Sequence, residues 1–271
     1  MKLSYFGTAA AEGFPALFCH CRHCNEARLL GGKNIRSRSQ ALIGDDLLID
    51  LPPDTYSHFL QNGVEGDKIA YLLITHSHSD HLAPAELILR REVHAREVRV
   101  PTLRIFCPES AARLIGSPLN TEVTVLTPYE TVTLGKYRVT PLPARHEEGG
   151  FIYLIESEGV TLLYAHDTGY FFEEVFSYLE EKGVRLDMIS MDCTNVDIPV
   201  SDEGRHMGLP NIGRLLTRLT AIGVVDEGTV RYVNHFSHNA APLQHLLEEK
   251  AAAYGCLVAY DGCVVEIEKR E

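Results

Sequence analysis

The sequence lacks a surplus of basic residues and lacks any long apolar run. Its 271 residues include 25 Lys and Arg against 37 Asp and Glu, which gives a formal net charge of −12. Proteins that hold nucleic acid mainly through its phosphates need basic patches, so we do not expect a nucleic-acid partner. The longest apolar runs fall far short of the roughly 20 residues that a membrane helix requires, so a membrane partner is not expected either.

Features of secreted proteins are also missing. Residues 1–7, MKLSYFG, are typical of a first strand and contain no apolar core of a signal peptide, so we expect a cytoplasmic protein. The seven cysteines are odd in number and three of them are clustered. This pattern argues against a disulfide framework and favours thiols or metal ligands.

The composition that remains is that of a globular protein with a sizeable core, with 45% hydrophobic and 23% charged residues. No linker, low-complexity segment or short repeat divides the chain, so we expect a single domain over residues 1–271. Strands and helices alternate, which indicates an α/β fold. We expect strands at 3–6, 39–43, 47–51, 71–74, 103–106, 123–126, 131–134, 137–142, 151–155, 160–164, 186–191, 230–233, 257–259 and 264–267, and helices at 25–30, 55–61, 84–96, 171–182, 210–222 and 243–253. Asp54 is expected to cap the second helix, and His58 and His94 are expected at the surface.

One stretch concentrates metal-ligand side chains. Three histidines and an aspartate fall within six residues, directly after the apolar strand at 71–74: His76, His78, Asp80 and His81. Neutral imidazole is the commonest protein ligand for divalent transition metals, and a loop at the end of a buried strand lets several side chains converge. This stretch therefore predicts a metal site.

Three more ligand-type residues follow predicted strands. His146 comes after the strand at 137–142, Asp167 after 160–164 and His235 after 230–233. In layered α/β folds, sites are assembled where several strands present their loops at one edge. With the first stretch they make seven N or O ligands, too many for one tetrahedral ion and about right for two ions that share a bridging carboxylate.

A second cluster has the spacing C-x-C-x-x-C: Cys19, Cys21 and Cys24. Three thiolates at this spacing can bind one tetrahedral zinc, but a closed structural site needs a fourth ligand. His20 and His23 are local candidates, and a distant histidine is another. Three reduced cysteines in a loop are the alternative. A redox pair is disfavoured because no thioredoxin-like strand-CxxC-helix context surrounds the cluster.

The pattern His76-x-His78-x-Asp80-His81, followed by one histidine, one aspartate and a late histidine, resembles the metallo-β-lactamase superfamily, and nearly the whole chain fits it. The resemblance implies an αββα four-layer sandwich with two divalent metal ions at one rim. It assigns His76, His78 and His146 to the first ion, Asp80, His81 and His235 to the second, and Asp167 to both.

The cysteine cluster resembles the phosphodiesterase branch of the carbon–phosphorus lyase pathway within that superfamily. That branch takes the fourth ligand of a structural zinc three residues beyond the late metal histidine, which here is His238, so that His20 and His23 would be spectators. The segment from Gly13 to Arg28 also resembles the accessory-protein branch of pyrroloquinoline quinone biosynthesis. The metal motif of that branch is degenerate, whereas this one is complete, which favours a competent hydrolase.

Two catalytic roles follow from the residues and the resemblance. Asp80, beside the ions, is suited to orient an attacking hydroxide. His206 matches a histidine that the phosphodiesterase and transfer-RNA-processing branches place near the leaving group, and we assign it the role of general acid. The alternative for His206 is a surface histidine at a helix start. His166 borders Asp167 but points the other way along its strand, so it is left out of the site.

The function that fits best is a phosphodiesterase acting on a small nucleotide-like or cyclic phosphate ester. A transfer-RNA 3′-end endonuclease would use the same site, but no flexible Gly/Pro-rich arm and no basic surface are present. Hydrolysis at carbon, as in a lactonase or thioester hydrolase, would depend less on His206. A non-catalytic accessory protein would not need the full set of metal ligands. Zinc and manganese both suit the mixed ligands. The oligomeric state is left open, with a homodimer as one option.

Overall fold

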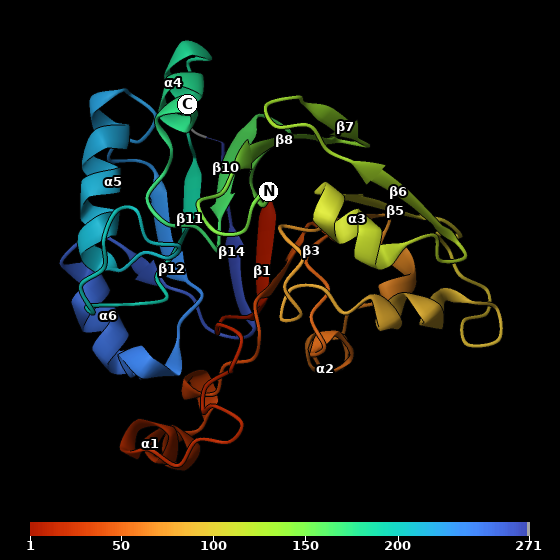
Figure 1. The fold of residues 1–271 in the computed structure, drawn as a ribbon, viewed down its shortest axis with the longest axis horizontal. Helices are drawn as coiled ribbons and strands as arrows, with labels where there is room; N and C mark the ends of the chain where they lie inside the picture. Colours follow the sequence, from red (N-terminus) through yellow and green to blue (C-terminus); the bar gives the residue numbers. More distant parts are fainter. Residues whose placement is uncertain (270–271) are drawn as a thin grey trace.

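Two mixed sheets face each other in the computed structural model, which describes residues 1–269 (Figure 1). Each sheet has seven strands within the described residues. The first runs in the order β14 (Cys263–Glu266), β1 (Lys2–Gly7), β2 (Gln40–Ile43), β3 (Leu47–Ile49), β4 (Tyr71–Leu73), β5 (Leu103–Cys107) and β6 (Thr121–Val125). The second runs in the order β13 (Leu257–Val258), β12 (Val230–Asn234), β11 (Met188–Asp192), β10 (Val160–Ala165), β9 (Phe151–Ser157), β8 (Tyr137–Pro143) and β7 (Val132–Leu134).

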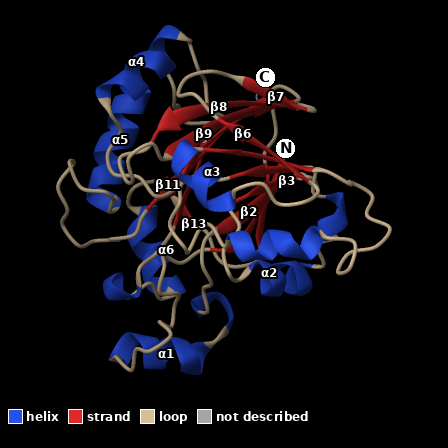
Figure 2. Cartoon of the chain, turned by 45° about the vertical axis from the view of Figure 1, so that its right-hand side comes forward, coloured by secondary structure: helices blue, strands red, loops and turns tan. Residues whose placement is uncertain are grey.

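Helices cover the outer face of each sheet (Figure 2). The first sheet is covered by α2 (Thr55–Asn62), the 3₁₀ helix η3 (Pro84–Arg90) and α3 (Glu109–Ile115); the second by α4 (Glu173–Glu181), α5 (Leu209–Ala221) and α6 (Gln244–Ala252). Helix α1 (Arg22–Leu30) belongs to a lobe away from both sheets, as Figures 1 and 2 show, and short 3₁₀ turns lie at η1 (Gly32–Asn34), η2 (Gly66–Lys68) and η4 (His238–Ala240). No helix in the described part of the chain is both long and apolar enough to cross a membrane.

Three apolar layers hold this arrangement together. Between the sheets, side chains such as Ile49 and Leu73 of the first sheet pack against Tyr153 and Leu162 of the second. The outer faces form two further clusters with their covering helices. Burial of alternate strand residues on both faces drives this layering, since each sheet must be shielded from water on two sides. The fold is the predicted αββα four-layer α/β sandwich.

Strand direction places the polar loops together. Strands β3 to β6 are mutually parallel, and so are β10 to β13. Strand β8 is antiparallel to β9, which is antiparallel to β10, so β8 and β10 run the same way. Parallel strands present their carboxyl ends at one edge of a sheet, and loops that follow them meet there.

Three local predictions are wrong. The helix expected at 84–96 is a 3₁₀ helix that ends at Arg90, because the Arg90 carbonyl accepts from the Asn120 side-chain amide at 2.9 Å instead of continuing a helix. Asp54 does not cap α2 with its side chain; it accepts from Arg38 Nη1 at 2.9 Å. His58 is not at the surface but only 1% exposed. His94 is exposed, as predicted.

Candidate metal centre

Loops from both sheets bring seven ligand-type side chains to one rim. The loop after β4 carries four of them, and the loops after β8, β10 and β12 carry His146, Asp167 and His235. They fall into two groups whose ligand atoms lie within 4.8 Å of one another: His76, His78 and His146 in the first, and Asp80, His81, Asp167 and His235 in the second. The folded chain thus brings together the residues that the sequence singled out for two ions.

The first group is a triangle of imidazole nitrogens. Nδ1 of His78 lies 3.0 Å from Nε2 of His76 and 3.0 Å from Nε2 of His146. The rings of His76 and His146 are nearly perpendicular, with centroids 4.7 Å apart, and the ligand nitrogens of the three histidines lie within 4.8 Å of one another. Two ligands on a tetrahedral ion at 2.0–2.1 Å lie about 3.3–3.4 Å from each other, close to these separations.

The second group is built around Asp167. Its Oδ1 lies 2.7 Å from Nε2 of His235, and its Oδ2 lies 3.3 Å from Nε2 of His81. The same Oδ2 lies 3.5 Å from Nε2 of His76 and 3.6 Å from Nε2 of His146. Asp167 therefore contacts both groups, the position that a bridging carboxylate requires. Oδ2 of Asp80 lies 3.4 Å from His81 Nε2 and adds the second carboxylate.

Unpaired buried atoms show that the second group suits a cation. Nε2 of His81, Oδ1 of Asp167 and Nε2 of His235 are buried and lie close to one another, but none of them makes a hydrogen bond with acceptable angles. Buried polar atoms are normally satisfied, so three that converge without partners fit the donor set of a divalent ion. Burial and the neighbouring His81 also lower the pKa of His76 well below its usual range, which favours the neutral imidazole that a metal needs.

Further hydrogen bonds fix how the imidazoles face inward. Asp50, directly after β3, lies with Oδ2 2.7 Å from Nδ1 of His81 and accepts from the Thr75 amide at 2.8 Å. The Thr194 hydroxyl lies 2.8 Å from Nδ1 of His235. A partner on one ring nitrogen sets the tautomer and turns the other nitrogen toward the metal. Asp50 and Thr194 were not predicted; Asp50 carries the same signal as the ligands, a carboxylate that ends a buried strand.

Backbone conformation also aims the ligands. Asp167 has φ of 52° and His235 has φ of 62°, both in the left-handed region. Such angles are uncommon for residues other than glycine, although Asp and His tolerate them better than most. In both loops the left-handed residue comes within two residues of the strand end. The turn directs the carboxylate or imidazole back over the rim.

His206 lies beside the two groups and has a carboxylate of its own. Its Nδ1 lies 2.8 Å from Oδ2 of Asp192, and its ring lies 4.6 Å from the ring of His146 and stacks on that of His235. Burial opposes the charge, but Asp192 raises the pKa of His206 to about 9. Since Nδ1 is engaged with Asp192, Nε2 is the nitrogen left for a ligand. The sequence did not reveal Asp192.

The cysteine lobe lies apart from this rim. The sulfur atoms of Cys19, Cys21 and Cys24 lie within 4.8 Å of one another. A hydrogen bond from the Cys24 amide lowers the pKa of Cys21 to about 7, whereas burial raises that of Cys24 to about 11. Three sulfur atoms that converge, one of them on a thiol that ionises readily, are suited to bind a thiophilic metal ion such as zinc. His238 does not join the sulfurs in the described part of the chain, because no group within 4.8 Å contains it.

His238, the proposed fourth ligand, is held in place by Glu12. Nδ1 of His238 lies 3.0 Å from Oε1 of Glu12, which also accepts from the His238 amide at 3.0 Å. Among the local candidates, His20 is exposed, and Nδ1 of His23 is buried without a partner. The choice between His238 and a local histidine therefore stays a prediction.

Comparison with known proteins decides the family. The family sequence model of the β-lactamase superfamily domain matches residues 46–230 of this chain. This range contains six of the seven ligands and His206. The chain belongs to this superfamily. It is accordingly a metal-dependent hydrolase of the metallo-β-lactamase fold. Comparison with curated proteins finds no match.

Solved structures share the fold of this superfamily member over almost its whole length. YhfI from Bacillus subtilis is 18% identical with a TM-score of 0.72, covering 97% of this chain and 98% of its own. A diphosphatase of the PhnP family is 21% identical with a TM-score of 0.74, covering 99% and 98%. Zinc-bound PqqB from Methylobacterium extorquens is 17% identical with a TM-score of 0.76, covering 98% and 100%. Identities this low establish the fold alone.

Proposed function

We propose that this hydrolase is a phosphodiesterase that acts on a small nucleotide-like or cyclic phosphate ester with two divalent metal ions, zinc or manganese, and that a structural zinc stabilises the cysteine lobe. The observation that carries the proposal is the pair of His206 and Asp192 beside the ligand groups. His206 also lies within 4.8 Å of His146 and Asp167, but a protonated imidazole cannot bind a metal, and its contact with Asp192 favours the protonated form. It suits a reaction in which an alkoxide leaves, as in phosphodiester hydrolysis.

The residues divide the reaction between them. The bound ions would be held by the two ligand groups and supply Lewis acidity and a lowered pKa of water. Asp80, beside the ions, would orient the attacking hydroxide. His206 donates its Nε2 proton to the departing alkoxide as the P–O bond breaks, and Asp192 stabilises the imidazolium and holds it in orientation.

Other features support this reading over its rivals. A diphosphatase and human tRNase Z both share the fold over almost the whole chain, so the fold fits either substrate and other features must separate them. The net charge of −12 disfavours an extended RNA substrate, so we propose a small-molecule partner and no nucleic acid. None of the seven cysteines, all of which lie in the described residues, forms a disulfide, and we propose a cytoplasmic location. The oligomeric state stays open in this proposal, with a homodimer as one option.

The test compares a phosphodiester with a lactone. The metal-loaded protein should hydrolyse a nitrophenyl phosphodiester, and His206→Ala should lower kcat about 10²- to 10⁴-fold with unchanged metal content. The loss should be larger for an alkyl ester, because a poorer leaving group depends more on a general acid. His94→Ala, at an exposed histidine, is the control and should leave turnover unchanged.

Three outcomes contradict the proposal. If His206→Ala leaves both phosphodiesters unaffected, His206 is not the general acid. If a lactone is turned over faster than either phosphodiester, the reaction takes place at carbon. If neither is hydrolysed by protein that holds two ions at the rim, the accessory-protein alternative is favoured.

A further inference from the structure

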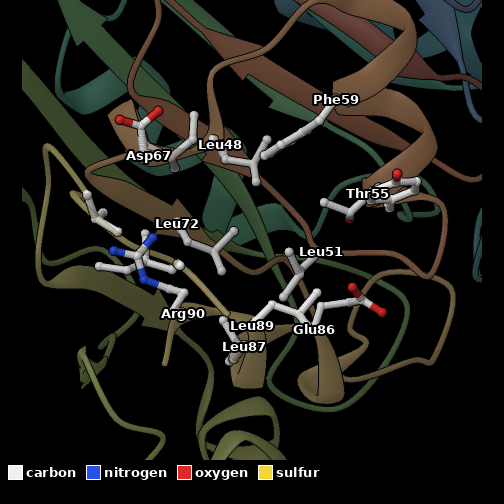
Figure 3. A pocket seen from close by; sticks show the side chains of 16 residues that line it. Leu48, Leu51, Thr55, Phe59, Asp67, Leu72, Glu86, Leu87, Leu89 and Arg90 are labelled. Carbon is white, nitrogen blue, oxygen red and sulfur yellow. The ribbon is translucent and has the colours of Figure 1, made fainter. Parts of the chain in front are cut away.

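A pocket of about 270 Å³ lies on the outer face of the first sheet, and none of the seven metal ligands lines it (Figure 3). Its floor is formed by Leu48 of β3 and Leu72 of β4, both almost fully buried. Phe59 of α2 and Leu87 of η3 close its sides. A volume close to 300 Å³ lined mainly by apolar side chains is at the lower end of the range for small-molecule sites.

One charged group in the wall has no counterion. Arg90, the last residue of η3, lines the pocket, and no carboxylate in residues 1–269 lies within 4.0 Å of its guanidinium. Its Nη2 donates to the Val100 carbonyl at 2.7 Å and its Nε is enclosed, whereas its Nη1 makes no hydrogen bond within the described residues and is not enclosed. Burial also lowers the pKa of Arg90. A guanidinium N–H that is open to the pocket and has no carboxylate partner can form a charge-assisted hydrogen bond with an anion.

The acidic residues of the wall do not supply this anion. Asp67 is committed to Arg99, with oxygen–nitrogen distances of 2.5 and 2.7 Å. Glu86 lies at the opposite end of the view from Arg90 in Figure 3. It forms no ion pair within the described chain, and its oxygens are not among the buried atoms without partners. Glu86 is half-buried and does not pair with Arg90, so Arg90 has no carboxylate partner within the described chain.

We propose that this pocket binds a small amphipathic monoanion, an acyl chain that ends in a carboxylate. The chain lies against Leu48, Leu72 and Leu87, and the carboxylate accepts from Arg90. A single charge is favoured over a phosphate, because Asp67 and Glu86 also line the pocket and repel a second negative charge. A methylene group is about the size of a water molecule and takes up roughly 30 Å³, so the pocket has room for about nine such groups. This is the length of the acyl chain of a medium-chain fatty acid.

The first experiment uses the wild-type protein and three probes of equal length: decanoate, decanol and decylamine. Decanoate should bind about 10- to 100-fold more tightly than decanol, since a hydrogen bond to a charged group contributes about 1.5–3 kcal/mol. Decylamine should bind no better than decanol. Titration calorimetry gives the three dissociation constants without any variant. Equal binding of decanoate and decanol, preference for decylamine, or no binding of any probe would overturn the proposal.

Variants place the ligand in the pocket. Arg90→Met keeps the apolar stem and removes the charge, so it should weaken decanoate about 10- to 100-fold and leave decanol unchanged. Arg91→Met is the matched control, because Arg91 is exposed and does not line the pocket. Ala95→Phe should fill the pocket and abolish binding of both probes. Thermal unfolding confirms that each variant is folded.

Two results would overturn the assignment. If Arg90→Met binds decanoate as tightly as the wild type does, the guanidinium of Arg90 does not contact the ligand. If no probe binds and Ala95→Phe converts a dimer to a monomer, the pocket belongs instead to an interface between two copies of the chain. Neither result bears on phosphodiester turnover, so this proposal and the proposed function fail independently.

Discussion

At the scale of single residues, the loop that carries most of the ligands is held by a carboxylate from another strand end. Ser77 lies between His76 and His78, and its amide donates to Oε2 of Glu147 at 2.8 Å. Its hydroxyl donates to the other oxygen of the same carboxylate. Glu147 follows His146, so this contact joins the two loops that form the first ligand group.

Glu147→Gln should therefore weaken metal binding. The amide offers one acceptor oxygen for two donors, and loss of a group that orients ligands typically lowers metal affinity about 10- to 100-fold. Competition with a chromophoric chelator measures the change directly. Glu148→Gln is the matched control, since Glu148 is exposed and adjacent. Equal affinities of the two variants would show that the contact does not support the ligands.

His58 makes stability depend on pH. Its Nδ1 lies 2.7 Å from Gln40 Oε1 and its Nε2 2.7 Å from the Ser37 hydroxyl, which also bonds to Asp261. Burial lowers the pKa of His58 to about 4, although Asp54 opposes the shift. Because the folded pKa lies below the unfolded value of about 6.5, the stabilisation is complete above that pH and is lost as the pH falls toward 4.

The free energy of unfolding should consequently fall by roughly 1 kcal/mol between pH 7.5 and 5.5 through His58 alone. His58→Gln should remove this part of the pH dependence in urea titrations, and His94→Gln, at an exposed site, should not. A His58→Gln variant with the wild-type pH profile would mean that the buried imidazole is protonated in the folded state as readily as in the unfolded one.

At the scale of elements, the cysteine lobe is the part that most depends on an ion. Its apolar cluster is small and consists mainly of Phe14, Ala16, Cys24, Ala27 and Leu243. A lobe with so few buried side chains gains much of its folding free energy from a bound metal.

Cys21→Ser should then lower both zinc content, by one ion per chain, and thermal stability. Elemental analysis and a melting curve measure the two together. His20→Ala should change neither, since His20 is exposed and treated as a spectator. An unchanged melting temperature in Cys21→Ser would show that the three sulfurs carry no structural ion.

The elements also show which parts of the structure could be predicted from the sequence. The ligands at strand ends could be predicted, because an apolar run followed directly by a ligand-type residue is a local sequence pattern. This pattern occurs at His76, His146, Asp167 and His235. The partners Asp50 and Asp192 could not, because they act on His81 and His206 only after strands distant in sequence come together. The burial of His58 and the end of η3 at Arg90 depend on contacts with Gln40 and Asn120, which no local periodicity encodes.

At the scale of the whole molecule, the metal centre joins the two sheets. Four ligands follow β4 of the first sheet, and three follow β8, β10 and β12 of the second. Ions bound there cross-link two layers that otherwise meet through apolar packing. Their binding energy therefore adds to the stability of the entire fold.

Removal of metal should lower the melting temperature and leave secondary structure intact. At a concentration 100 times Kd, one ion contributes about 2.7 kcal/mol, which corresponds to a shift of roughly 5–10 °C for a chain of this size. Calorimetry with and without a chelator measures the shift. Asp167→Asn, which alters the carboxylate shared by both groups, should show a smaller shift; an equal shift would place the stabilising ion elsewhere, for example in the cysteine lobe.

The left-handed backbone at Asp167 and His235 has a consequence for how the protein can change. At these two positions local conformational preference opposes the native state, so in the language of energy landscapes they are frustrated, and in return each position presents a ligand. Laboratory selection for heat resistance in the absence of metal should replace them with glycine before it alters the core, because glycine adopts these angles without steric strain. Variants enriched in this way would be more stable but would lack two of the metal ligands and therefore the activity. At these two positions stability and function make opposite demands on the sequence.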